Sequence, residues 1–390
     1  MPEAVEAPVV LSDRPGSFPR SVLAERHPAL IRKVRDAFPY GPEQHQELDA
    51  LLRSSTEGVI EPLGAEAHDH ARWQEWGHEY FGRSWFDVPF LWAESYFYRR
   101  LLEAVGYFAA GPWQGVDPFR PFKQAELTTD EARQEARALD ALAEKPVDEQ
   151  RRALLHGSLW GNRADLGFQI QTGGATSGDD TPLVVDDSEA LWSLMPAGNT
   201  GTVCLVADNA GRELLPDLLL IDHLLRHRHA DRVVLELKPY PYYVSDAMTA
   251  DVLDCLRFLR AADGVAGETG ARLWSLIGAG RLVLRAHPFC CAPLPYADMP
   301  GDLRREFAGA DLTLFKGDLN YRRLVGDRLW PPTTPFTDVT AYFPGPVAAL
   351  RTLKSEVIVG LDATTETALT TAHGERWRTS GTHALVQARK

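Results

Sequence analysis

The sequence predicts an α/β protein: a three-layer α/β/α sandwich with a mainly parallel sheet and a helical N-terminal region. Two observations carry this prediction. The first 160 residues contain helical patterns without the alternation of a strand. After a Gly/Thr/Asp-rich stretch at 172–181, short β-branched runs alternate with helical segments. Strands that alternate with helices indicate a parallel sheet covered by helices on both faces.

The helical part is predicted to hold five helical segments. They are the ranges 21–38, 43–63, the aromatic-rich stretch within 84–108, a segment from the TTDE motif to about 145, and 148–160. Thr128 and Glu131 have the spacing of a capping box, which marks a helix start. We expect a helical N-terminal region over 1–165 and an α/β metal- and phosphate-binding domain over 166–390.

The second part is predicted to supply the strands. Candidate strands lie at 183–187, 202–207, 232–237, 281–286 and 311–316, with helices expected at about 213–227 and 247–260. Right-handed crossovers place the loops after parallel strands at one edge of the sheet. Ligands bind at that edge in such folds, so polar residues directly after strands are the first candidates for a site.

The charge balance and composition limit the possible partners and the expected location of the protein. Acidic residues outnumber basic ones, 54 to 41, for a net charge of −13, which argues against nucleic-acid backbones and anionic membranes as partners. We expect a cytoplasmic protein, because no 18-residue apolar run occurs, the first residues are acidic rather than basic, and the four cysteines lack CxxC spacing. The sequence does not indicate an oligomeric state.

Two acidic clusters follow successive predicted strands. Asp208 and Asn209 end one strand, with Glu213 at the start of the next helix, and Asp246 follows the next strand after Lys238. Carboxylate and amide oxygens suit hard divalent cations. Taken singly, each of these residues is equally well explained as a helix N-cap. Because parallel strands end at the same edge, the three side chains can approach one site.

Two basic clusters could bind an anion at the same edge. Lys316 closes a strand, Gly317 follows, and Asp318, Leu319, Asn320, Tyr321 and Arg322 enter a turn. This arrangement suits phosphate, although it lacks P-loop spacing. Arg351 and Lys354 of the RTLK tetrapeptide are expected just before a β-branched run, and by themselves they are better explained as a solvated surface than as the positive side of an anion site. Asn162, after a helix, is either a ligand-binding residue or a cap.

In combination and in order, these clusters resemble the damage-control phosphatase family, in the subgroup marked by an RTxK motif and called the acidic residue methyltransferase 1 group. The motifs VADNAGRELLPDLLLIDHLL, PYYVSDAM, FKGDLNYRRLVGDRLW and RTLK carry the resemblance, together with WAESYFYRR, DPFRPFK and SLWGNRADL. It extends from about Phe18 to the C-terminus. The resemblance implies a sandwich fold and hydrolysis of phosphate esters, with sugar phosphates such as fructose 1-phosphate as substrates.

The resemblance also implies roles for the residues. Asp208, Asn209 and Asp246 would bind a divalent ion, Mn²⁺, Co²⁺ or Ni²⁺, with Mg²⁺ as a further candidate. A small phosphorylated metabolite would contact these three residues and Lys354. It would also contact Lys316 and the segment Asp318 to Arg322. Asp246 and Asp318 are the candidates for nucleophile or general acid, and attack by a metal-activated water is the other route.

Two other functions compete with this hypothesis. One is an S-adenosylmethionine-dependent protein-carboxylate O-methyltransferase, which would want a glycine-rich loop after the first strand that TGTVCLVADN does not supply. The other is a non-catalytic sugar-phosphate binder or pathway accessory, which has little need of intact metal ligands.

Overall fold

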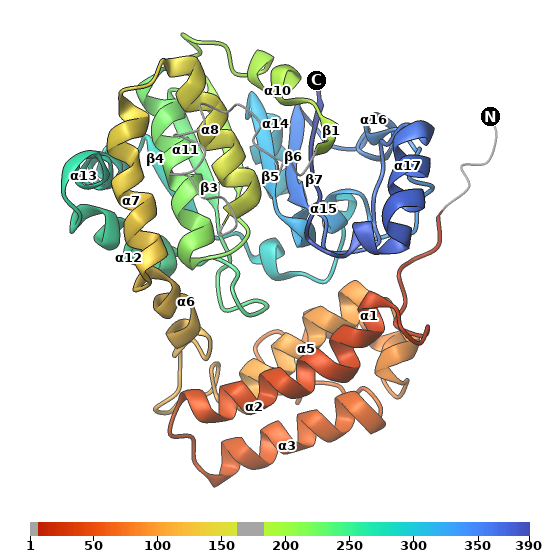
Figure 1. Ribbon diagram of the computed structural model, residues 1–390. Coiled ribbons are helices and arrows are strands. Elements are labelled where there is room, and N and C mark those ends of the chain that lie inside the picture. Colours follow the sequence, from red (N-terminus) through yellow and green to blue (C-terminus); the bar gives the residue numbers. More distant parts are fainter. Residues whose placement is uncertain (1–6, 162–182) are drawn as a thin grey trace.

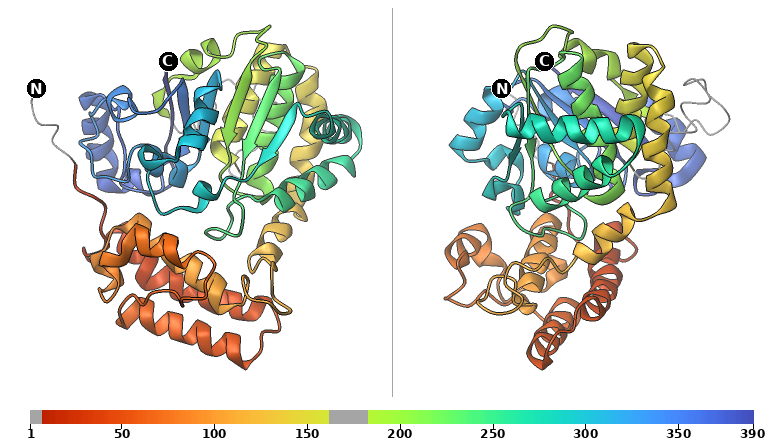
Figure 2. Two further views of the ribbon diagram at one scale, coloured as in Figure 1. Left: turned by 180° about the vertical axis from the view of Figure 1, so that it is seen from behind. Right: turned by 90° about the vertical axis from the view of Figure 1, so that its left-hand side faces the viewer.

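The structure is a computed structural model that describes residues 7–161 and 183–390. Figure 1 shows a central sheet flanked by helices, with a group of N-terminal helices lying beyond one edge of the sheet. The two further views in Figure 2 show the same separation between the sheet and the first helices.

A seven-stranded sheet forms the centre of the molecule, with the spatial order β1-β7-β6-β5-β2-β3-β4. Strands β2 to β6 are parallel to their neighbours, β7 is antiparallel to β6, and β1 is parallel to β7. This confirms the predicted α/β class with a mainly parallel sheet. The bounds are β1 Leu183–Asp186, β2 Thr202–Val206, β3 Arg232–Glu236, β4 Leu282–Arg285, β5 Leu312–Lys316, β6 Val347–Thr352 and β7 Ala384–Arg389.

The end of the chain departs from the expectation. The RTLK tetrapeptide was expected before a β-branched strand, but the strand is β6 itself, which ends at Thr352. The β-branched run at 357–359 is buried without being a strand. The sequence pattern also did not predict β7, which pairs antiparallel with β6 over its whole length. A buried apolar run can therefore fill the core without joining the ladder.

Both faces of the sheet are buried, as the three-layer prediction requires. In β2, Val203 and Leu205 pack with helices on one face, while Cys204 and Val206 belong to the core of the other face. This follows from the two-residue period of a strand. The first face is covered by α7 Asp130–Ala143, α8 Val147–Trp160, α10 Ser188–Ser193, α11 Leu214–Arg226, α12 Thr249–Arg260 and α13 Gly264–Gly278.

The second core is more aromatic and continues into the N-terminal helices. It takes residues from the segment 289–310, which includes α14 Gly301–Ala308, and from around α15 Asp318–Leu324 and α16 Phe336–Val339. Helix α17 Ala363–His373 lies near the C-terminal strand. The four cysteines are free and buried.

The N-terminal helices form a compact group around the buried helix α5 Phe90–Ala104. The others are α1 Phe18–Ser21, continued by a π-helical turn, α2 His27–Ala37, α3 Pro42–Glu57 and α4 His70–Gly77. Helix α6 Arg120–Leu127 lies apart from this group and contacts α7, α12 and the turn before α11. One local prediction is corrected at the start of α7. The cap is Thr129, whose Oγ1 accepts from the Ala132 N–H at 3.2 Å, whereas the Thr128 hydroxyl donates back to the Ala125 carbonyl.

Helices α7 and α8 belong to the layer on the sheet, although they precede residue 165. They pack against α13 and α11 respectively. The expected domain boundary at 165/166 lies in 162–182, outside the described residues, and stays a prediction. In the described part of the chain, no helix has both the length and the apolar character needed to cross a membrane.

Candidate active site

The predicted site residues meet at the carboxyl edge of four neighbouring strands. Because β6, β5, β2 and β3 are adjacent and parallel, the segments that follow them converge. These segments carry Asp208 after β2, Asp246 after β3, Asp318 after β5 and Lys354 after β6. Asn162 lies outside the described residues.

The segments after β2 and β3 are joined by their backbones. Asn209 and Asp246 form an isolated antiparallel bridge, and the Ala247 N–H donates to the Asp208 carbonyl at 2.8 Å. The Ser245 hydroxyl donates to Asn209 Oδ1 at 2.7 Å. Asp208, Asn209 and Asp246 therefore lie together, as the strand-end argument predicted.

The helix-cap explanation of these residues is not what the structure shows. The short 3₁₀ turn after β2 has Ala210 at its N-cap, and α12 has Met248. Asp208 and Asp246 are instead 6% and 4% exposed. Buried carboxylates that cap no helix need another source of stabilisation.

The carboxylates are crowded. Burial raises the pKa of Asp208 well above its usual range, and the negative charges of Glu213 and Asp246 raise it further. Burial also raises the pKa of Asp246, against the opposing effect of Lys238, whose Nζ lies 3.3 Å from Asp246 Oδ2. The Asn209 amide donates to both Asp208 and Glu213. This concentration of negative charge attracts a cation.

Two lysines supply positive charge beside these acids. Burial opposes the charge of Lys316, but Asp217, Glu213 and Asp208 outweigh it and raise the lysine's pKa. The Lys316 ammonium contacts Asp217 Oδ1 at 3.0 Å. Lys354 has an exposed side chain whose pKa is raised in the same way, burial being outweighed by Glu213, Asp208 and Asp318.

The same lysines reverse the expected behaviour of Glu213. Burial alone would raise the pKa of this carboxyl, but Lys316 and Lys354 together lower it. Of the Glu213 and Asp208 carboxyl groups, Glu213 therefore ionises more readily, and Asp208 retains its proton more readily. The carboxyl groups of Asp208 and Glu213 thus lie close to the ammonium groups of Lys316 and Lys354.

Asp318 holds the RTLK segment in place. Its Oδ1 accepts from Arg351 Nε at 2.8 Å, from the Lys354 N–H at 3.1 Å and from the Ser355 hydroxyl at 3.1 Å. Burial would raise the pKa of Asp318, but Arg351 and Arg322 outweigh burial and lower it. Asp318 is consequently an ionised carboxylate at neutral pH, and Arg351 binds it while also donating to the carbonyls of Ser355 and Val357.

Gly317 is needed between these groups. Its φ of +90° lies in the left-handed region, and a Cβ at this position would lie 2.0 Å from Asp208 Oδ2. Its N–H donates to the Leu350 carbonyl at 2.8 Å, so that group is committed to the sheet and not to an anion. Glycine here allows the β5–α15 turn to touch the Asp208 carboxylate.

The side chains of the segment 319–322 mostly bind the protein itself. Leu319 is buried in a small cluster with Leu91, the Asn320 amide donates to the carbonyls of Ala207 and Lys316, and the Tyr321 hydroxyl donates to Gln387. Asn320 Oδ1, by contrast, is buried without a hydrogen-bond partner. A buried acceptor without a partner needs an explanation in the structure.

Arg322 is held in an ion pair and is not an open phosphate cradle. Its Nε and Nη2 donate to the two carboxylate oxygens of Asp327 at 2.6 and 3.0 Å, and Nη1 lies 3.3 Å from Glu94 Oε2. Burial is the main reason that the pKa of Glu94 is raised to about 7. The guanidinium thus joins α15 to α5.

Three residues that sequence reasoning did not assign to the site are buried and charged. They are Glu94, Asp217 and Lys123, whose Nζ donates to the Asp246 carbonyl and to Asp251, both at 3.0 Å. A charged residue in an otherwise apolar helix, as in LLPDLLLID, was the available signal for Asp217. No local pattern indicated the partner of Asp217, because Lys316 is 99 positions away in the sequence.

The residues present fit a divalent ion by their chemistry. Two carboxylates and an amide oxygen, from Asp208, Asp246 and Asn209, are a hard donor set. Among residues 7–161 and 183–390 no three His, Cys, Asp or Glu side chains group so as to hold a metal. The amide of Asn209 would therefore have to complete the set.

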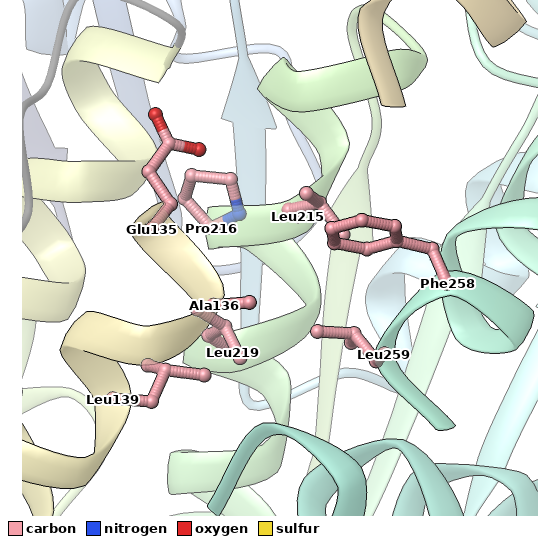
Figure 3. Close-up of a pocket in the computed structure, with 8 residues that line it drawn as sticks. All are labelled: Glu135, Ala136, Leu139, Leu215, Pro216, Leu219, Phe258 and Leu259. Atoms are coloured by element: carbon pink, nitrogen blue, oxygen red, sulfur yellow. The ribbon is translucent and has the colours of Figure 1, made fainter. Parts of the chain in front are cut away.

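A small hollow elsewhere in the protein has a different character. It lies between α7, α11 and α12 (Figure 3), and none of the strand-end residues lines it. Its lining is apolar apart from the Glu135 carboxylate: Ala136, Leu139, Leu215, Pro216, Leu219, Phe258 and Leu259. A phosphorylated ligand has no cation to bind there, so the strand-end site remains the candidate.

Fold and site together define an α/β protein with an acidic oxygen-donor site and two lysines at the carboxyl edge of a parallel sheet. Comparison with known families agrees with the resemblance read from the motifs. A family model described as "Damage-control phosphatase ARMT1-like domain" matches residues 22–369. The chain belongs to this family.

Three relatives illustrate the similarity, each named "Damage-control phosphatase ARMT1". The protein of Mus musculus is 30% identical over 440 aligned positions, covering 98% of both chains. That of Homo sapiens is 30% identical over 432, covering 95% of this chain and 96% of the relative. That of Xenopus laevis is 32% identical over 337, covering 78% and 75%. A solved DUF89 family protein from Pyrococcus horikoshii has a TM-score of 0.47 at 15% identity, covering 85% and 90% of the two chains.

Proposed function

We propose that this protein is a metal-dependent phosphatase that hydrolyses small phosphate esters, with sugar phosphates such as fructose 1-phosphate as its substrate class. One observation carries the proposal. Asp208, Asn209 and Asp246 lie together beside Lys316 and Lys354, so a cation site and an anion site adjoin. The name of the relatives supports the same reaction class.

In this proposal, the residues divide the work by charge. Asp208, Asn209 and Asp246 would hold Mn²⁺, Co²⁺ or Ni²⁺, with Mg²⁺ as a further candidate. Such an ion, when bound, acts as a Lewis acid on a phosphoryl oxygen and orients it. Lys316 and Lys354 would balance the charge that develops on the phosphoryl oxygens. Asn320 Oδ1, the unpartnered acceptor, would bind a substrate hydroxyl.

The pKa directions distinguish the two acids that are candidates for the chemistry. Burial raises the pKa of Asp246 in the protein without an ion, so this residue could give a proton to the leaving oxygen only if it were not a ligand of the metal, because a ligating carboxylate has lost its proton. The lowered pKa of Asp318, caused by Arg351 and Arg322 against the effect of burial, favours an ionised nucleophile or base. Attack by water in place of Asp318 remains the other route.

The test is a phosphate-release assay with a panel of phosphate esters and Mn²⁺, Co²⁺, Ni²⁺ or Mg²⁺ against a chelated control. We expect turnover only with added metal, and loss of at least about 100-fold in Asp208→Ala and Asp246→Ala. Asp302→Ala, which removes an exposed carboxylate on α14, serves as the matched control and should keep full activity. Full turnover in either site variant would refute the assignment.

The methyltransferase hypothesis makes a different prediction for the same protein. Submicromolar binding of S-adenosylmethionine in a calorimetric titration, without phosphate release from any ester, would favour it over the phosphatase. Binding of sugar phosphates with no turnover under any metal would instead favour the accessory binder.

A further inference from the structure

A single oxygen atom in the N-terminal helices connects two loops of the candidate site. Glu94 Oε2, on α5, accepts from the Tyr243 hydroxyl at 3.1 Å and lies 3.3 Å from Arg322 Nη1. Tyr243 belongs to the 239–248 loop that carries Asp246, and Arg322 belongs to α15, which begins at Asp318. One side chain thus joins the proposed metal-binding loop to the proposed substrate-binding helix.

The 239–248 loop has an unusual backbone conformation at the point where Glu94 holds it. Tyr243 has a φ of 51°, in the left-handed region that residues with a Cβ rarely occupy. Such a residue persists only when its surroundings hold it there. Its ring stacks on Tyr98 of α5, with centroids 4.8 Å apart and planes 24° apart. Two contacts from α5 therefore fix this residue.

The neighbouring contacts hold the same loop from the same side. The Ser95 hydroxyl, also on α5, lies 2.7 Å from the Tyr242 hydroxyl. Lys123 of α6 donates to the Asp246 carbonyl at 3.0 Å. The path of the loop, and with it the place of Asp246 beside Asp208, is thus set by helices outside the sheet.

We propose that Glu94 and Tyr243 are positioning residues, which hold Asp246 in place for the metal ion and tie its loop to the substrate-binding helix α15. Neither side chain would touch the ion. The inference rests on the proposed function, because it requires that Asp246 be a metal ligand. Buried groups that orient a ligand without contacting the metal change its affinity by about 10- to 100-fold when removed.

The experiment compares Tyr243 of the loop with Tyr96, which belongs to α5. Tyr243→Phe removes the hydroxyl that donates to Glu94 and keeps the stacked ring. Tyr96→Phe is the matched control, because it removes a hydroxyl that donates to the Glu61 carbonyl at 2.7 Å, away from the site, in a bond that is partly buried like that of Tyr243. Mn²⁺ is titrated calorimetrically into chelator-treated protein, and the Tm of each variant is measured without metal.

We expect Tyr243→Phe to raise the Mn²⁺ dissociation constant about tenfold, while Tyr96→Phe leaves it within about twofold at a similar loss of Tm. Ser95→Ala, which frees Tyr242, should act in the same direction and serves if Tyr243→Phe does not fold. Equal dissociation constants in wild type, Tyr243→Phe and Ser95→Ala would overturn the inference while leaving the proposed function standing. If the wild type binds no Mn²⁺, the proposed function fails, and this inference with it.

Discussion

The Lys316–Asp217 pair allows a quantitative prediction, because both groups are almost completely buried. Asp217 is 0% exposed and Lys316 is 2% exposed, with 3.0 Å between Nζ and Oδ1. Ser158 also donates to Asp217 Oδ1 at 2.6 Å. The substitution Asp217→Asn keeps the shape and the neutral hydrogen bonding but removes the charge that compensates the lysine.

The magnitude follows from the distance. At 3.0 Å and an effective dielectric constant of about 20, two unit charges attract by about 5 kcal/mol. Removing one partner of a buried pair typically costs about 3–5 kcal/mol. Since Glu213 and Asp208 still face Lys316, we expect the lower end, about 3 kcal/mol of unfolding free energy, for Asp217→Asn.

Urea unfolding of four chelator-treated proteins measures the pair directly: wild type, Asp217→Asn, Lys316→Met and the double variant. Because removing both charges leaves neither member of this pair without its partner, the double variant should be at least about 2 kcal/mol more stable than the sum of the single losses predicts. Additivity within about 0.5 kcal/mol would refute the coupling. A loss below about 1 kcal/mol in Asp217→Asn would refute the view that Asp217 stabilises the charged lysine.

Two further predictions follow from buried groups. Gly317→Ala should weaken Mn²⁺ binding about 10- to 100-fold in a calorimetric titration, because its Cβ would displace the Asp208 carboxylate; unchanged affinity would contradict the contact. The pKa of His27 is lowered from the ordinary 6.5 to about 3, chiefly by burial and further by the charge of Arg26. The ring of His27 stacks on Phe97. The folded state therefore favours neutral His27. The contribution of this residue to the free energy of unfolding is complete above pH 6.5 and is lost as pH falls toward 3. The wild type should lose about 3 kcal/mol relative to His27→Leu between pH 7 and pH 4, measured by urea unfolding; a pH-independent difference would be the contrary result.

Much of the fold was accessible from the sequence because parallel strands leave a strong local signal. Strands β1 to β5 lie within one residue of the predicted bounds, since each is a short β-branched run between helices. The position of Asp208 and Asp246 followed from one topological rule, that parallel strands end at a common edge. The antiparallel β7 had no such context. Arg351 was expected to precede a strand formed by the β-branched run, whereas it lies inside β6, which ends one residue later.

The parts of the site that were not predicted depend on contacts between distant segments. Glu94 lies 228 positions from Arg322, and Lys123 lies 123 positions from Asp246. Local patterns explain such residues only as the edge of a helix. Likewise, nothing in KGDLNYR shows that Arg322 is neutralised by Asp327, five positions later, across the end of α15.

The direction of β7 has a practical consequence for experiments on this protein. Because β7 runs antiparallel to β6, residue 390 comes out at the edge of the sheet opposite the strand-end site, and Figure 1 shows it far from the N-terminal helices. An affinity tag, a fluorescent reporter or a linker to a sensor chip attached there would leave the strand-end site open. Val10, near the start of the described part of the chain, is instead hydrogen-bonded to Phe90 and Asp327, beside the helices that border the site. Immobilised assays should therefore anchor the chain by its last strand.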